Sequence, residues 1–144
     1  MLLSKEIAVY LNLSACKLKQ YTGSALRRAG VDLTPEQFLV VYLLWNQGAM
    51  SQQQIADSLG KDKNSVTKLL DALEKKSFVK REPSRTDRRS NTVRLTKKAE
   101  ALKTEAKETG ISMLDRMLEG ISEDALRAFL DTLGKMNANM SVKL

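Results

Sequence analysis

The sequence contains no histidine and only one cysteine, Cys16. Histidine is the commonest general base and the commonest metal ligand in proteins, so its absence removes the usual basis of an active site. One cysteine allows no disulfide within the chain and no multi-cysteine zinc site. The sequence also lacks a glycine-rich phosphate loop and a paired-carboxylate motif. We therefore expect no enzymatic activity, no metal and no cofactor.

Long hydrophobic runs are also missing. Residues 1–6 lack the apolar stretch of ~7–15 residues that a signal peptide needs. No segment is long and apolar enough to span a bilayer. We therefore expect a cytoplasmic protein with no membrane partner.

Aromatic residues make up only 5% of the chain, whereas an all-β chain usually carries more valine, isoleucine, tyrosine and phenylalanine. This composition favours a mainly helical fold.

The excess positive charge is concentrated in the middle of the chain. The whole sequence of 144 residues has a net charge of +7. Residues 61–103 hold 14 basic and 6 acidic side chains, so the flanking segments together contribute no net positive charge. A focus of this kind indicates a polyanionic partner, either nucleic acid or an anionic membrane surface.

Two helices are expected in the first third of the chain. Apolar residues recur at helical spacing over 5–28, and Gly30 follows them. The segment 34–37, Thr-Pro-Glu-Gln, supplies a capping threonine, a proline suited to the first helical position and a glutamine that completes a capping box. The run 38–45 is apolar on nearly every face, so we expect a central, buried helix that ends at Gly48.

The next segment has the pattern of a helix-turn-helix. Residues 51–54 form a second capping box, and the short helix behind it ends at Gly60. Asp62 can cap a further helix that runs to about Lys76. Two short helices with a tight break that contains glycine are typical of a helix-turn-helix.

A basic β-hairpin is expected over residues 77–95. The sequence there is less helical in pattern, and residues 92–95 alternate polar and apolar side chains. Pro83 lies where an edge strand or a loop tolerates proline. The hairpin loop carries a cluster of three arginines with one aspartate among them. We expect two short strands joined by a strongly basic loop.

Two more helices are expected at the C-terminus, over 96–118 and 122–140, on either side of Gly120. The apolar stripes of 5–28 and 122–140 are too long for the rest of this chain to cover. We therefore expect a homodimer whose interface these two helices supply. The resulting fold class is mainly α with a small β-hairpin. A winged helix-turn-helix DNA-binding domain (31–96) is flanked by a helical dimerisation region (1–30 and 97–144).

This order of elements assigns DNA-binding roles to particular side chains. A helix can enter the major groove and contact base edges there. Asn64 suits an adenine edge, Thr67 a thymine methyl, and Lys68 guanine or phosphate, whereas the first residues of the helix also favour phosphate. The candidate contacts in the recognition helix are Lys63, Asn64, Ser65, Thr67 and Lys68, and Asp71 lies on the same outward face.

The hairpin loop supplies the second set of candidates. Arg85, Arg88 and Arg89 suit the narrow minor groove and phosphate contacts. Asp87 does not suit DNA binding directly, so we expect it to pair with a neighbouring arginine and order the loop. A solvated loop with salt bridges is the less specific alternative.

On these residues the sequence resembles the MarR (multiple antibiotic resistance regulator) family. The resemblance implies a homodimer with an interface of N- and C-terminal helices, a wing in the minor groove, and in many members a loss of DNA affinity on binding a small phenolic or lipophilic effector. Its motifs cover the segments 33–38, 54–56 with Leu59, 66–70, 73–76, 79–81, 87–90 and 93–96.

Three positions depart from the family pattern. Ser77 stands where the family often has glycine, and serine costs ~1 kcal/mol relative to glycine if the backbone there is left-handed. Glu100 replaces a glycine that often follows the wing, which should not weaken a helix. Cys16 lies about two turns after the position of the sensing cysteine in the family's organic-hydroperoxide sensors, so we expect it to be inert.

The sequence thus predicts a DNA-binding transcription regulator, expected to be a repressor, that acts as a homodimer on palindromic duplex DNA. Its release by a small lipophilic or phenolic ligand is an implication of the resemblance. The alternative is a winged-helix nucleic-acid-binding protein without a regulatory ligand. Tyr42 and Trp45 are expected to pack in the core, with the border of an effector cavity as the alternative.

Overall fold

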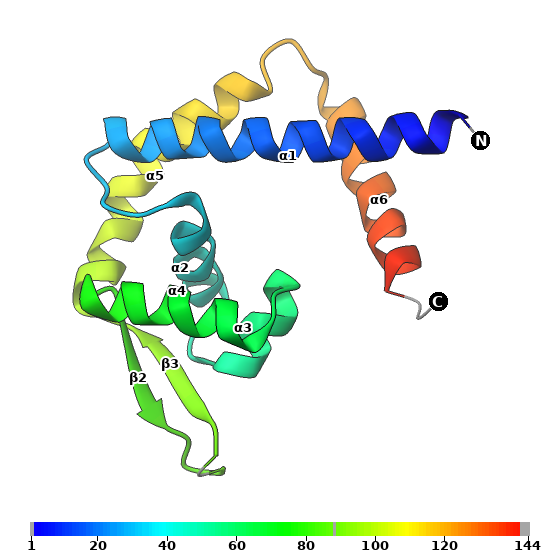
Figure 1. Cartoon of the computed structure of the whole chain (residues 1–144). Helices are drawn as coiled ribbons and strands as arrows, with labels where there is room; N and C mark the ends of the chain where they lie inside the picture. Colours follow the sequence, from blue (N-terminus) through cyan, green and yellow to red (C-terminus); the bar gives the residue numbers. More distant parts are fainter. Residues whose placement is uncertain (1, 88, 142–144) are drawn as a thin grey trace. The chain divides into compact units, whose positions relative to one another are not determined.

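The computed structural model describes residues 2–87 and 89–141, and within them all side chains except those of 105–112. The chain divides into two compact units, residues 1–111 and 112–144. The prediction of a mainly helical fold with a small β-hairpin is confirmed (Figure 1). The elements are α1 (Leu2–Arg28), α2 (Pro35–Gln47), β1 (Met50–Ser51), α3 (Gln52–Leu59), α4 (Lys63–Lys75), β2 (Val79–Pro83), β3 (Asn91–Leu95), α5 (Lys97–Met117) and α6 (Glu123–Met140).

The helix starts lie where the capping residues predict them. The Thr34 hydroxyl accepts a hydrogen bond from the Gln37 N–H at 3.2 Å, and the Gln37 side chain accepts one from the Thr34 N–H at 3.1 Å. Ser51 and Gln54 form the same reciprocal pair at the start of α3. The Asp62 carboxylate accepts from the Ser65 N–H at 2.7 Å. Each cap satisfies backbone donors that have no partner inside the helix.

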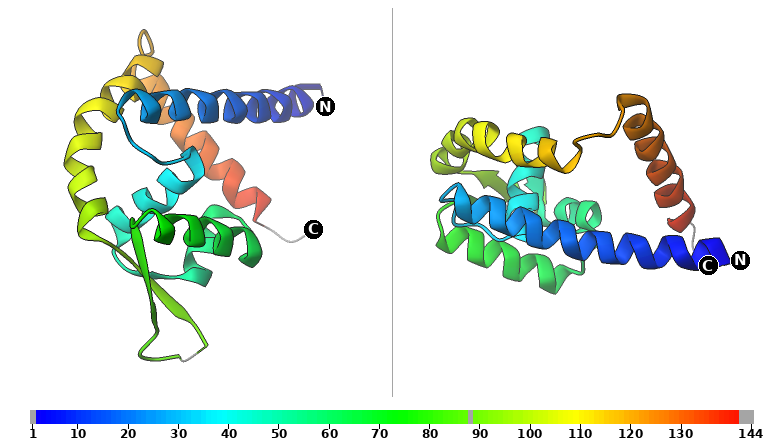
Figure 2. Two further views of the ribbon diagram at one scale, coloured as in Figure 1. Left: turned by 60° about the vertical axis from the view of Figure 1, so that its left-hand side comes forward. Right: turned by 90° about the horizontal axis from the view of Figure 1, so that it is seen from above.

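The sheet has three antiparallel strands in the order β1-β3-β2. Val79 pairs with Leu95 and Pro83 with Asn91 across the predicted hairpin, which projects away from helices α2, α3 and α4 in Figure 1 and in the left view of Figure 2. Strand β1 was not predicted. It pairs Met50 with Val93, and two residues are too few to show an alternating pattern.

The core of the first unit lies between the helix-turn-helix and the sheet. Ile55 of α3, Leu70 and Leu73 of α4, and Val93 of β3 are fully buried, together with Val40 and Val41 of α2. The first turn of α5 closes this core, where Ala99 is buried and its carbonyl accepts a hydrogen bond from Trp45 Nε1 at 3.0 Å. Apolar packing therefore holds α4 and the hairpin in one body.

The prediction that 38–45 is buried on nearly every face is wrong. Leu39 is 49% exposed and Tyr42 is 52% exposed, so Tyr42 does not pack in the core. Val40, Val41 and Leu44 of this helix are buried in the core, and α1, α4 and β3 contact the helix. Leu39 and Tyr42 lie on the side that these elements leave uncovered. Phe38 and Trp45 are half-buried and meet edge to face, 5.7 Å apart between ring centroids.

The backbone at Ser77 has φ = 62°, which is the left-handed region. Ser77 therefore adopts the left-handed conformation whose cost was weighed from the sequence. It turns the chain from the end of α4 into β2, and the Ser77 carbonyl accepts a hydrogen bond from the Thr96 hydroxyl at 2.6 Å.

In the second unit, α6 begins at the Ser122 cap, where the hydroxyl accepts a hydrogen bond from the Ala125 N–H at 3.3 Å.

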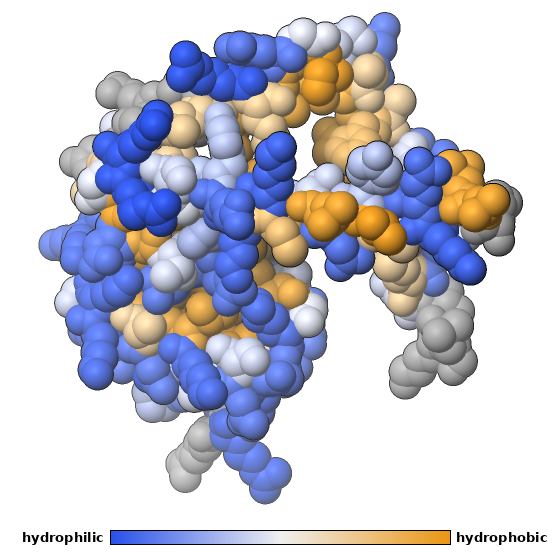
Figure 3. All heavy atoms as spheres, turned by 45° about the horizontal axis from the view of Figure 1, so that its top comes forward, coloured by the Kyte–Doolittle hydropathy of each residue, from blue (hydrophilic) through white to orange (hydrophobic). Residues whose placement is uncertain are grey.

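The terminal helices expose many large hydrophobic side chains. Hydrophobic residues appear in orange at the surface in Figure 3. Those of α1 are Leu2, Leu3, Ile7, Val9, Tyr10, Leu13 and Leu18, and those of α6 are Phe129, Leu130 and Met140.

Candidate nucleic-acid interface

Helix α4 carries the predicted recognition residues on its surface. Lys63, Asn64 and Lys68 are exposed, whereas Ser65 and Thr67 are half-buried. The buried face of the same helix consists of Val66, Leu70 and Leu73. The helix is therefore strongly amphipathic, and its outer face offers two ammonium groups and one amide to a ligand.

Two of the predicted contact residues also form hydrogen bonds with neighbouring residues in the first turn of α4. The Ser65 N–H donates to Asp62, so it is not free to bind a phosphate. This hydrogen bond is the main reason that the pKa of Asp62 is lowered. The Thr67 hydroxyl donates to the Lys63 carbonyl at 2.9 Å, which leaves the Thr67 methyl group as its remaining distinctive contact for a base.

The wing, formed by β2, β3 and their loop (residues 79–95), is ordered by short-range hydrogen bonds. The Ser84 N–H donates to the Ser90 carbonyl at 2.9 Å and closes the loop. The Asp87 carboxylate accepts from the Arg89 N–H at 2.9 Å. Asp87 thus contacts an arginine through its backbone, in the manner of an Asx turn.

Three of the four predicted wing residues are exposed at the surface. Arg85, Asp87 and Arg89 are exposed, and the ion pairs between described residues include none of the three. Arg88 lies outside the described residues. The guanidinium groups of Arg85 and Arg89 are therefore solvated and accessible to an anion.

Arg81 of β2 joins the wing to α4, which the sequence analysis missed. Its guanidinium donates to Asp71 at 2.6 Å and to Glu74 at 3.2 Å, and its N–H donates to Glu74. The hydrogen bonds with Glu74 and Asp71 raise the pKa of Arg81, and the pKa of Glu74 is lowered by the same contact. Asp71, which was expected on the outward face, is therefore committed to the wing.

A second contact joins the other strand of the wing to α3. The Asn91 side-chain amide donates to the Gln52 side chain at 3.1 Å. With the Arg81 contacts, this places a polar link on each strand of the hairpin. No sequence periodicity signals either link, because each joins residues from different elements.

Among the described residues, no group of three or more cysteine, aspartate or glutamate residues is placed to hold a metal ion. Within that part of the chain, no helix has the length and hydrophobicity that crossing a membrane requires.

The family model described as MarR family matches residues 33–91. The chain is similar to the HTH-type transcriptional regulator MhqR of Bacillus subtilis (strain 168), with 30% identity over 94% of this chain and 92% of MhqR. It is also similar to YfiV of the same organism, an uncharacterized HTH-type transcriptional regulator, with 38% identity over 72% of this chain. The match spans 64% of the length of YfiV.

The fold is similar to that of a repressor whose structure was solved with DNA bound. The structure of the transcriptional repressor CouR bound to a 23-mer DNA duplex superposes with a TM-score of 0.82 and 29% identity, over 94% of both chains.

Proposed function

The chain belongs to the MarR family of winged-helix transcriptional regulators, and we propose that it binds duplex DNA as a homodimer at a palindromic operator and represses transcription there. Helix α4 inserts into the major groove, and the wing contacts the minor groove. The proposal assigns the chain no catalytic step and places it in the cytoplasm.

One observation carries this proposal: the exposed cations of α4 and of the wing belong to a single braced body. Lys63 and Lys68 lie on the outer face of α4, and Arg85 and Arg89 lie in the wing loop. Arg81 connects the two elements through Asp71 and Glu74. A groove-reading helix and a basic hairpin at a fixed separation suit adjacent grooves of duplex DNA.

The homodimer is supported by the exposed apolar side chains of the terminal helices. Tyr10 and Leu13 of α1 are 64% and 62% exposed, and Leu130 of α6 is 67% exposed. Exposed apolar surface on this scale favours burial against another surface. Two-fold symmetry of the protein then implies two half-sites about one helical turn apart.

The repressor role and an effector are the finer parts of the proposal. CouR, a transcriptional repressor by name, supports repression through its similarity over nearly the whole chain. Resemblance to the family implies a small phenolic or lipophilic effector that lowers DNA affinity. The exposed apolar side chains of Leu39 and Tyr42 on α2 support a site for it.

Selection of bound sequences from random duplex DNA tests the core of this proposal. We expect an inverted repeat, and light scattering of the free protein at micromolar concentration should give the mass of a dimer. A monomer mass would contradict the dimer. If single-stranded DNA or RNA binds more tightly than duplex DNA in a parallel binding assay, the alternative nucleic-acid-binding role is favoured.

A further inference from the structure

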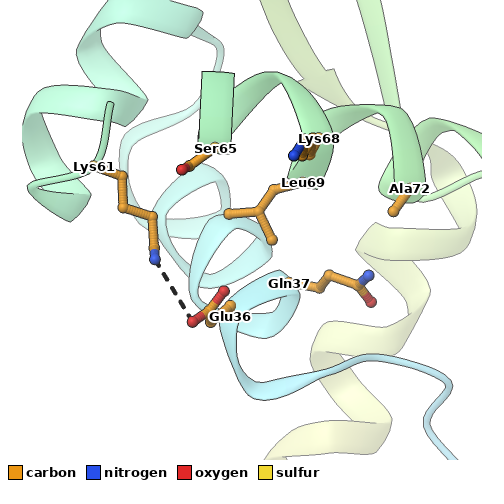
Figure 4. A pocket seen from close by; sticks show the side chains of 7 residues that line it. All are labelled: Glu36, Gln37, Lys61, Ser65, Lys68, Leu69 and Ala72. Carbon is orange, nitrogen blue, oxygen red and sulfur yellow. Dashed lines mark ion pairs between the residues drawn. The ribbon is translucent and has the colours of Figure 1, made fainter. Parts of the chain in front are cut away.

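Consecutive residues in the first turn of α2 contact lysines at opposite ends of α4. Glu36 lies 3.6 Å from the Nζ of Lys61, which directly precedes the cap of α4. Gln37 accepts a hydrogen bond from the Nζ of Lys76, the residue at the C-terminal cap, at 3.0 Å. Figure 4 shows this first turn beneath α4, with Lys61 directed toward Glu36.

The contact at the C-terminal end is dense. Lys76 Nζ also donates to the backbone carbonyl of Asp32 at 3.2 Å and lies 3.4 Å from the carboxylate of that residue. Gln37 is buried, at 7% exposed, and its side-chain oxygen accepts from both Lys76 and the Thr34 N–H. The Gln37 oxygen would still have a partner without the ammonium group, so loss of that group breaks the link to α4 and leaves the capping box of α2 in place.

At the N-terminal end, two lysines share one carboxylate, that of Glu36. Glu36 is bound by Lys19 of α1 at 3.0 Å as well as by Lys61. The hydrogen bond from Lys19 and the charge of Lys61 lower the pKa of Glu36. Glu36 therefore remains ionised at neutral pH and holds the start of the α4 segment.

The surface between the two contacts is hollowed. A hollow of about 280 Å³ lies there, bordered by polar side chains as well as by Leu69 and Ala72 of α4. The buried face of α4 supplies most of the attraction to the core, but apolar attraction has no direction. Hydrogen bonds and ion pairs do have preferred geometries, so the two lysines restrict how far α4 can shift or rotate over this hollow.

We propose that Lys61 and Lys76 are positioning residues, which clamp the two ends of α4 to the first turn of α2 and so fix the orientation in which α4 meets the DNA. This inference rests on the proposed function, since it takes α4 as the helix that contacts bases. Neither lysine needs to contact DNA. Each lysine restricts the orientations of α4 in the free protein, so less conformational freedom is lost when the protein binds DNA.

The matched pair Lys76→Met and Lys75→Met tests the clamp. Both variants remove one positive charge at the end of α4, but Lys75 is exposed and lies outside the clamp. On a duplex selected by the parent protein, Lys76→Met should raise the dissociation constant by about five- to tenfold, and Lys75→Met by less than about twofold. The salt dependence of binding should be the same for Lys76→Met as for the parent, because no phosphate contact is lost.

Further variants control for charge and for folding. Lys76→Arg should restore most of the affinity, since arginine keeps the charge and can donate to Asp32 and Gln37. Lys61→Met should weaken binding in the same direction, again at unchanged salt dependence. Equal losses in Lys75→Met and Lys76→Met, or a salt slope reduced by about one unit, would overturn the proposal in favour of charge or direct phosphate contact.

Amide hydrogen exchange of the free protein tests the clamp without DNA. Lys76→Met should accelerate exchange in the last turns of α4 by about five- to tenfold, with little change in α3 and none for Lys75→Met. If the parent selects no duplex, the proposed function fails, and the exchange rates still decide whether the clamp exists. Unchanged exchange in α4 of Lys76→Met would refute it.

Discussion

Arg81 of strand β2 and Asp71 of helix α4 form an ion pair with 2.6 Å between Nη2 and Oδ1. The Arg81 side chain is 20% exposed and that of Asp71 is 57% exposed, so the contact is only partly shielded from solvent. Through it the wing and the recognition helix are held at a fixed separation. The same arginine binds Glu74, so both acidic residues on this side of α4 serve the wing.

Replacing Arg81 with methionine should remove the polar brace between the wing and α4 and leave only their apolar packing. The aliphatic stem is retained, but Asp71 and Glu74 lose their common partner, and we expect the free energy of unfolding to fall by about 1 kcal/mol. Affinity for the selected duplex should fall by more than removal of one charge explains. Denaturant unfolding and binding isotherms measure the two effects.

Arg94→Met provides the matched control for that experiment. Arg94 lies on β3, is 58% exposed and forms a longer contact of 3.5 Å with Glu82 of the same hairpin. It removes the same charge from the wing without touching α4. If both variants lose the same affinity, the Arg81 contact contributes only charge and the bracing role is wrong.

Replacing Ser77 with glycine should stabilise the protein. Serine at φ = 62° is in a conformation that glycine adopts without a steric penalty, so the free energy of unfolding should rise by about 1 kcal/mol. The hydrogen bond from Thr96 goes to the backbone carbonyl and is retained. Thermal unfolding measures the change. Ser58→Gly, in the exposed part of α3, should have the opposite sign, and stabilisation of that variant would show that the Ser77 effect is not conformational.

Local chemistry explains which parts of this fold could be predicted from sequence. A cap needs one side chain and a backbone N–H only three residues away, so Thr34, Ser51 and Asp62 locate three helix starts. The unusual position of Ser77 was also recognisable, because the resembled family often has glycine there, and a left-handed residue commonly follows a helix.

The parts that could not be predicted depend on contacts between distant segments. Arg81 contacts residues seven and ten positions away on another element, and Lys76 contacts Gln37 across 39 positions. The exposure of Tyr42 was missed for a related reason. Hydrophobicity records the tendency of a side chain to be buried, whereas the other elements of the chain determine how many faces of a helix are covered.

Replacing Cys16 with serine should leave DNA binding unchanged, with or without peroxide. Cys16 is exposed on α1 and is the only cysteine of the chain, so no second thiol within the chain can form a disulfide with it. Binding isotherms before and after peroxide treatment provide the measurement. Release of the parent from DNA by peroxide, abolished in Cys16→Ser, would identify a redox switch.

The wing and the recognition helix should respond differently to substitution. Arg88→Ala and Arg89→Ala should weaken binding to selected and scrambled duplexes alike, with a salt slope reduced by about one unit for each lost phosphate contact. Asn64→Ala, Thr67→Ala and Lys68→Ala should cost ~1–3 kcal/mol on the selected duplex and much less on the scrambled one. Isotherms at several salt concentrations separate the two patterns. A loss in Arg89→Ala that is confined to the selected duplex, at unchanged slope, would mean that the wing also reads sequence.

Asp87 distinguishes loop ordering from charge. Asp87→Ala removes a negative charge near the DNA, which alone should tighten binding, but it also removes the acceptor that holds the Arg89 N–H. We expect weaker binding on both duplexes, because the disordered loop must then be fixed at the moment of binding.

Asp87→Asn is the decisive companion, since its side-chain oxygen can still accept that hydrogen bond while the charge is gone. It should bind at least as tightly as the parent. If both variants bind more tightly, charge alone matters and Asp87 does not order the loop. If both bind more weakly by the same factor, the carboxylate charge itself is required, as it would be for an ion pair with a neighbouring guanidinium group.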